Sequence, residues 1–96
     1  MKTALITGAT SGIGKATAEL FAKNKIRLIL CGRRGKRLAQ LKEFLSDFTE
    51  VTTLKFDVSK RKEVAEAIQS LPENFKKIDI LINNAGNAHG LATIQD

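Results

Sequence analysis

The sequence predicts an α/β fold in which helices cover both faces of a parallel sheet. Short apolar runs alternate with segments of helical periodicity along the chain. The connection between successive runs is long enough for a helical crossover, which joins parallel strands with right-handed connections. In addition, a glycine-bearing segment follows the first run and another follows the fourth. Ligands of such sheets bind beyond the carboxyl ends of the strands where the strand order reverses.

Four apolar runs are predicted as strands, and they cover residues 3–7, 26–31, 51–57 and 78–83. Short runs of this kind, bounded by turn residues, are typical of buried parallel strands. The element order is therefore βαβαβαβ. In the doubly wound, Rossmann-type arrangement the strands lie in the order 3-2-1-4, with the reversal between the first and the fourth.

The three segments between these strands have apolar residues at the spacing of one helix face. The first helix face comprises Ile13, Ala16, Thr17, Leu20 and Phe21. The second comprises Leu38, Leu41, Leu45 and Phe48. The third comprises Val64, Ala67, Ile68, Leu71 and Phe75, and Ser59 is expected as its N-cap.

Composition restricts the classes of partner. The chain has 96 residues, no linker-like tract and a formal net charge of +6, which fits one domain and attraction to an anion. Most lysines fall on predicted solvated helix faces or loops, and the absence of Trp and Tyr removes the stacking platform that single-stranded nucleic acid uses. We therefore expect an anionic small molecule rather than nucleic acid.

The amino-terminal stretch and the number of cysteines indicate the cellular compartment of the protein. After Met1-Lys2-Thr3, only three apolar residues precede the first glycine, too few for a signal-peptide core or a membrane span. Cys31 is the single cysteine and His89 the single histidine, so neither a disulfide nor a metal site is expected. Cys31 is interpreted as a small buried group and His89 as a loop residue. We expect a cytoplasmic protein without a membrane partner.

The segment 7–14, Thr-Gly-Ala-Thr-Ser-Gly-Ile-Gly, has the features of a phosphate-binding turn. Its glycines permit a tight turn, close approach of a pyrophosphate and close packing of helix on strand. The hydroxyls of Thr10 and Ser11 can donate hydrogen bonds, and the following helix directs its free N–H groups at the turn. The alternative is a glycine-rich turn that binds no ligand.

The spacing in this segment is G-x-x-x-G-x-G, because Thr17 stands where the G-x-G-x-x-G fingerprint has its third glycine. With Asp57-Val58 after the third strand and Asn83-Asn84-Ala85-Gly86 after the fourth, it resembles the short-chain dehydrogenase/reductase superfamily. The resemblance implies roles for three groups of residues. They are pyrophosphate contacts by Gly8, Gly12, Ile13 and Gly14, adenine contacts by Asp57 and Val58, and a path beside the adenosine ribose for Asn84, Ala85 and Gly86.

Two of these motifs also have a purely structural interpretation. Asp57 at a strand end can cap the turn to Ser59, and Asn83-Asn84 can simply begin a tight turn.

Arg33 and Arg34 follow the second strand, where a dinucleotide site usually has an acidic residue for the ribose 2′-hydroxyl. A guanidinium there can bind a 2′-phosphate through two hydrogen bonds, so we predict NADP(H) rather than NAD(H). The alternative is a pair of solvated arginines at a helix start.

The family catalyses hydride transfer between a nicotinamide and a carbonyl or alcohol, using a serine, a tyrosine and a lysine four residues after it. This chain contains no tyrosine, so the resemblance places no catalytic residue in it. We expect residues 1–96 to be the amino-terminal cofactor-binding part of a longer NADP(H)-dependent enzyme that acts on a small molecule and forms a homo-oligomer.

The stretch Gly32-Arg33-Arg34-x-x-Arg37-Leu38 resembles family members that act on serine and other 3-hydroxy acids, and also several acyl-carrier and sugar reductases. The alternative function is that of a nucleotide-binding module without catalysis.

Overall fold

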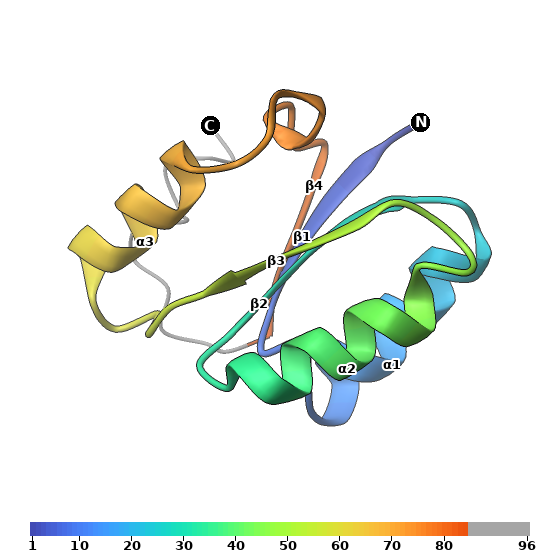
Figure 1. Cartoon of the computed structure of the whole chain (residues 1–96), viewed down its shortest axis with the longest axis horizontal. Coiled ribbons are helices and arrows are strands. Elements are labelled where there is room, and N and C mark those ends of the chain that lie inside the picture. Colours follow the sequence, from blue (N-terminus) through green and yellow to red (C-terminus); the bar gives the residue numbers. More distant parts are fainter. Residues whose placement is uncertain (85–96) are drawn as a thin grey trace.

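The computed structural model describes residues 1–84 and contains one four-stranded parallel sheet. Its strands are β1 (Thr3–Thr7), β2 (Arg27–Gly32), β3 (Val51–Lys55) and β4 (Ile80–Asn83). They lie in the order β3-β2-β1-β4, which confirms the predicted topology (Figure 1). All five residues of β1 are buried, because this strand has a neighbour on each side and layers on both faces.

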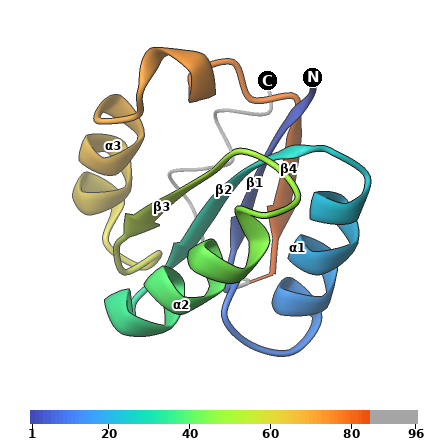
Figure 2. The same ribbon diagram turned by 45° about the vertical axis from the view of Figure 1, so that its right-hand side comes forward.

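Helices cover the two faces of the sheet as predicted. The helices α1 (Gly12–Lys23) and α2 (Gly35–Leu45) lie on one face, and α3 (Arg61–Gln69) lies on the other, followed by the short 3-10 helix η1 (Glu73–Phe75) (Figures 1 and 2). Side chains alternate between the faces along each strand. In β1, Ala4 and Ile6 join the core under α1 and α2, whereas Leu5 joins the core under α3.

The predicted buried face of the first helix is wrong except for Phe21, which is partly buried and packs against the core. Ile13 and Leu20 are 74% and 59% exposed, and the buried residues of α1 are Gly14, Ala18 and Ala22. These three residues have little or no side chain, so the helix axis can approach the sheet closely. The periodicity of the large apolar residues predicted that Ile13 and Leu20 face the sheet. Close packing of the helix instead buries the small residues.

Several boundaries also differ from the predicted ones. Helix α2 ends at Leu45, so Phe48 lies beyond it, although it still packs on the core. Helix α3 ends at Gln69, and Leu71 and Phe75 are buried outside it. Pro72 follows Leu71 and disfavours helical backbone in that residue, so α3 ends before Leu71, and Phe75 lies beyond the proline in η1.

The strands also differ at their ends from the predicted runs. The second strand covers residues 27–32 instead of 26–31, the third ends at Lys55 instead of Asp57, and the fourth begins at Ile80 instead of Ile78.

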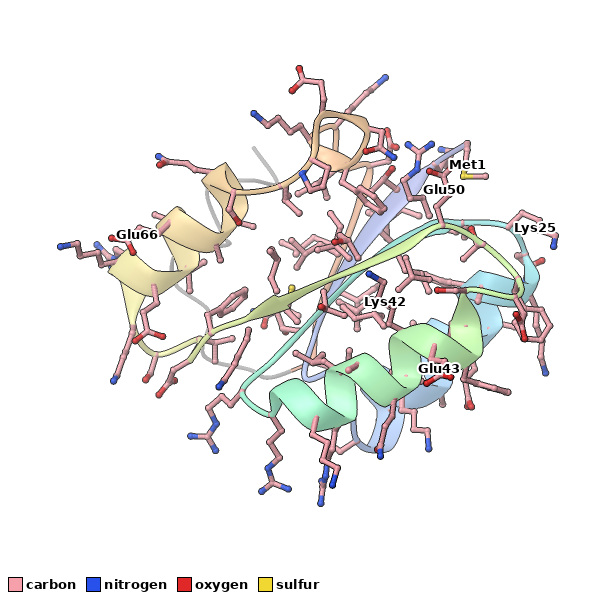
Figure 3. All side chains as sticks on the ribbon, viewed as in Figure 1. Met1, Lys25, Lys42, Glu43, Glu50 and Glu66 are labelled. Atoms are coloured by element: carbon pink, nitrogen blue, oxygen red, sulfur yellow. The ribbon has the colours of Figure 1, made fainter. Side chains whose placement is uncertain are left out.

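The charged side chains lie mainly on the outer surfaces. Lys42 and Glu43 of α2 and Glu66 of α3 are all exposed, and Glu66 points away from the sheet (Figure 3). In residues 1–84, no helix has the length and apolar character needed to cross a membrane.

Candidate functional site

A cleft of about 620 Å³ lies at the carboxyl ends of the strands. Four separate segments build it, and eight of the predicted site residues line it. Gly8, Thr10 and Ser11 come from the turn after β1, and Arg33 and Arg34 follow β2. Asp57 and Val58 follow β3, and Asn84 follows β4. The sheet order thus brings together residues up to 76 positions apart, as in the hydrogen bond between Gly8 and Asn84.

Hydrogen bonds fix the glycine-rich turn to both neighbouring strands. The N–H of Ala9 donates to the carbonyl oxygen of Cys31 at 3.1 Å, which joins the turn to β2. The side-chain amide of Asn84 donates to the carbonyl oxygen of Gly8 at 3.2 Å, and the Thr7 hydroxyl donates to Oδ1 of Asn83 at 3.0 Å. The position of the turn is therefore coupled to the chain that leaves β4.

The glycines have different structural tasks. Gly8 and Gly12 have φ values of +59° and +54°, a region that favours glycine. Gly14 is buried, and a Cβ on it would collide with the carbonyl oxygen of Gly8 and lie 2.8 Å from Nδ2 of Asn84. Gly14 thus lets α1 begin directly against the turn.

Three of the predicted pyrophosphate residues, Gly12, Ile13 and Gly14, do not belong to the cleft wall itself. They form the first residues of α1 beside it. Ser11 is the N-cap of this helix and makes no side-chain capping hydrogen bond. The first turn of α1 therefore presents N–H groups beside the cleft without a side-chain acceptor from its N-cap, an arrangement that suits an anion.

Arginines form the part of the cleft next to β2. Arg33 and Arg34 are exposed and line it together with Gly32, and Arg34 is the N-cap of α2. A third arginine, Arg37, also lines the cleft, although no role in binding was predicted for it. The signal that could have identified Arg37 is its place in the first turn of the helix that Arg34 begins, where helical winding keeps it near the same strand end.

The Asp57 carboxylate accepts two hydrogen bonds from Ser59, one from its hydroxyl at 2.7 Å and one from its backbone N–H at 3.0 Å. These bonds, the hydroxyl first, lower the pKa of Asp57 from 3.8, and the positive charges of Arg33 and Lys60 act in the same direction. Asp57 therefore stabilises its own turn while it lines the cleft.

The predicted capping role of Ser59 is wrong. The N-cap of α3 is Lys60, with extended backbone angles of −105° and 93°. The Ser59 hydroxyl donates to Asp57 instead of accepting a helix N–H.

Four further residues that the sequence singled out are Cys31, Ala85, Gly86 and His89. Cys31 is fully buried, and burial raises the pKa of its thiol, so it behaves as a core residue. Ala85, Gly86 and His89 lie outside the described residues. Within residues 1–84, no group of three or more His, Cys, Asp and Glu side chains could hold a metal ion.

Comparison with known proteins gives close relatives along almost the whole chain. Over 92 residues it is 48% identical to sulfoacetaldehyde reductase 2 of Chromohalobacter salexigens, covering 96% of this chain and 36% of that protein. Over 98 residues it is 48% identical to the NADP-dependent 3-hydroxy acid dehydrogenase of Schizosaccharomyces pombe, covering 99% and 38%. The chain thus spans little more than a third of the length of these relatives.

A solved structure with the same fold is that of L-sorbose reductase from Gluconobacter frateurii, complexed with NADPH and L-sorbose. The two structures superpose with a TM-score of 0.81 at 39% sequence identity, over 88% of this chain and 33% of that one. The family model for short chain dehydrogenases matches residues 2–96. Together with the parallel sheet and the glycine-rich turn, this match shows that the chain belongs to the short-chain dehydrogenase family.

Proposed function

We propose that this chain binds NADP(H) and forms the cofactor half of an oxidoreductase that transfers hydride between the nicotinamide and a carbonyl or alcohol substrate. The observation that carries the proposal is the position of Arg33 and Arg34 in the cleft, at the end of β2. An NAD site usually has an acidic residue there for the ribose 2′-hydroxyl. Guanidinium groups bind a 2′-phosphate in its place.

The turn after β1 suits the pyrophosphate. Gly8 and Gly12 have backbone angles that glycine adopts readily, and the first turn of α1 lies beside the cleft with no side-chain hydrogen bond from its N-cap. In this proposal the pyrophosphate lies along Gly8, Gly12, Ile13 and Gly14, and the hydroxyls of Thr10 and Ser11 donate to its oxygens. A cleft of about 620 Å³ is within the usual range for a bound small molecule.

The other end of the cleft suits the adenosine. Asp57 and Val58 line it and would contact the adenine ring, and Asn84 would lie beside the ribose, with Ala85 and Gly86 continuing that path. The bound nicotinamide supplies the hydride or accepts it, and the residues of this chain hold the cofactor in place. The 96 residues contain no tyrosine, so the proposal places the family's catalytic residues outside them.

The comparisons support both the cofactor and the substrate class. The L-sorbose reductase structure contains NADPH, and the S. pombe relative is named as NADP-dependent. We propose a 3-hydroxy acid as the substrate, because that relative is a 3-hydroxy acid dehydrogenase at 48% identity.

We also propose that residues 1–96 form the amino-terminal part of a single dinucleotide-binding domain, in a protein that is a homo-oligomer. We propose a cytoplasmic location, because the single cysteine, Cys31, fits a reducing compartment.

Calorimetric titration of the whole protein with NADPH and NADH tests the cofactor. Loss of a charge-assisted hydrogen bond costs about 1.5 to 3 kcal/mol, so Arg33→Ala should weaken NADPH binding roughly ten- to over a hundred-fold and leave NADH binding nearly unchanged. Arg61→Ala is the matched control, because Arg61 begins α3 and does not line the cleft. Equal affinities of the unaltered protein for the two cofactors would contradict the proposal.

A turnover assay tests the substrate class. The whole protein is supplied with a 3-hydroxy acid and NADP⁺, and separately with sulfoacetaldehyde and NADPH, and the absorbance of NADPH is followed. We expect oxidation of the 3-hydroxy acid. Turnover of sulfoacetaldehyde alone would reassign the substrate, and tight NADPH binding without any turnover would favour the non-catalytic nucleotide-binding module.

A further inference from the structure

We infer that Arg37 is a specificity-determining residue of the cleft, and that its guanidinium binds the 2′-phosphate from the side of α2 while Arg33 and Arg34 bind it from the end of β2. The inference rests on the proposed NADP(H) function and deepens it. It divides the discrimination between NADPH and NADH over two structural elements instead of one loop.

The packing of α2 determines where Arg37 lies. Leu38 is 1% exposed and, with Leu41 and Leu45, anchors the helix on the sheet. Leu38 also lies against Gly32, because a Cβ on that glycine would be 3.5 Å from a Leu38 methyl carbon. Successive residues of a helix are 100° apart. Arg37 is therefore held at one edge of the buried stripe, beside the end of β2.

Lys36, the cation next to Arg37 in the sequence, does not line the cleft. Lys36 lies about 200° around the helix from Leu38, and it lines neither the cleft nor the groove between α1 and α2. Lys36 and Arg37 are both exposed. The structure thus offers two adjacent cations on one helix, of which only the second reaches the cleft.

Arg37 and Arg34 also lack partners. Within residues 1–84, neither guanidinium makes a hydrogen bond or an ion pair, although the Arg34 carbonyl oxygen accepts the N–H of Leu38, and the ion pairs there use other cations. Arg37 also borders a groove of about 590 Å³ between α1 and α2, in which Glu19 is the one carboxylate among the described lining residues. Glu19 makes no ion pair with it.

Three arginines therefore line the same cleft. Their mutual repulsion opposes this arrangement, and the nearby Asp57 carboxylate is already bound by Ser59. An anion with several oxygens would neutralise the group, and a phosphate offers oxygens to more than one guanidinium at the same time.

The test compares Arg37→Ala, Arg37→Lys and the control Lys36→Ala in the whole protein. Calorimetry measures the affinity for NADPH and NADH, and also for adenosine 2′,5′-bisphosphate and AMP, which differ from each other only by the 2′-phosphate and contain no nicotinamide. We expect Arg37→Ala to weaken NADPH and adenosine 2′,5′-bisphosphate roughly ten-fold or more, and NADH and AMP less than about two-fold. Arg37→Lys should have an intermediate effect, because lysine keeps the charge but loses the planar fork.

The ratio of the NADPH affinity to the NADH affinity separates the possible outcomes. If Arg37→Ala leaves that ratio unchanged, as Lys36→Ala should, the inference is overturned while the preference of the unaltered protein for NADPH still supports the proposed function. A loss that is equal for both cofactors, with a lower melting temperature of the ligand-free protein, shows a structural role and also overturns it. If the unaltered protein binds NADPH and NADH equally, both the inference and the proposed function fail.

Discussion

At the scale of single residues, the glycines of the turn after β1 are not equivalent. Gly12 needs glycine for its backbone angle, since its φ is +54° and nothing lies within 4 Å of the position of a Cβ. Gly14 needs glycine for space, because a Cβ there would collide with the backbone of Gly8. A motif written as three glycines therefore combines a conformational requirement with a packing requirement.

This difference predicts the effect of two alanine substitutions on the free energy of unfolding. Gly12→Ala should lose about 1 to 2 kcal/mol, the usual cost of a left-handed backbone for a residue with a Cβ. Gly14→Ala should lose more, about 3 kcal/mol, because overpacking against a carbonyl that cannot rotate away forces the backbone to move. Urea denaturation of the two variants measures both values.

Asparagine at the same positions is the control. Asn tolerates positive φ, so Gly12→Asn should be more stable than Gly12→Ala, whereas Gly14→Asn should gain nothing over Gly14→Ala. Similar behaviour of both positions would contradict the assignment of a separate task to each glycine.

Asp57 gives a prediction that depends on pH. Its pKa in the folded protein is lowered, so the hydrogen bonds from Ser59 stabilise the fold above the unfolded pKa, and this contribution is lost as pH falls through the folded pKa. Ser59→Ala removes the bond that lowers the pKa most, and the pKa of Asp57 should rise toward 3.8. Arg33→Ala should raise it less. NMR titration of the Asp57 carboxyl carbon distinguishes the two variants.

At the scale of elements, the sequence could predict the strands and their order but not which side of α1 is buried. Strand order follows from the alternation of runs and crossovers, which needs no side-chain detail. The buried face of α1 consists of Gly14, Ala18 and Ala22, and small residues contribute little to an apolar pattern although they permit the closest packing. The larger Ile13 and Leu20 are left exposed beside them.

The candidate site, too, could be predicted from the sequence only in part. Gly8, Arg33, Asp57 and Asn84 could be predicted because each follows a strand that ends at the same edge of the sheet. Arg37 was not predicted, because its place in the cleft depends on how α2 is rotated about its axis. The predicted burial of Leu38, which the structure confirms, sets that rotation and was a signal for Arg37. The role of Ser59 depends on a local hydrogen bond to Asp57 that competes with helix capping.

The rotation of α1 leads to a prediction about the stability of this helix. Leu20→Gln should change the free energy of unfolding by less than about 0.5 kcal/mol, because Leu20 is 59% exposed. Ala18→Leu should destabilise by about 1 to 3 kcal/mol, because Ala18 is fully buried between helix and sheet. Thermal unfolding followed by circular dichroism compares the two, and the reverse order would restore the face predicted from periodicity.

At the scale of the whole molecule, charge and topology act together. The chain has a formal net charge of +6, yet its lysines, which are spread over helices, loops and strand ends, do not line the cleft. The sheet order brings the turns after β1 and β2 to the same edge, and with them the first turn of α1 and three arginines. Attraction for an anion is therefore concentrated where the strands end.

This concentration of charge predicts how salt affects binding of the two cofactors. NADPH differs from NADH by one phosphate, which in the proposed site would contact Arg33, Arg34 and Arg37. These arginines are exposed, and salt screens charge interactions effectively at an exposed site. Raising the ionic strength from about 0.01 M to about 1 M shortens the Debye length from roughly 30 Å to roughly 3 Å. The affinity for NADPH should therefore fall with added salt more steeply than the affinity for NADH, and the two should converge. Titrations of the whole protein with both cofactors over this range measure how steeply each affinity falls with salt.

Arg33→Ala should reduce the salt dependence of NADPH binding, whereas Arg61→Ala, which does not line the cleft, should leave it nearly unchanged. Parallel slopes for the two cofactors would show that the arginines do not contact the additional phosphate.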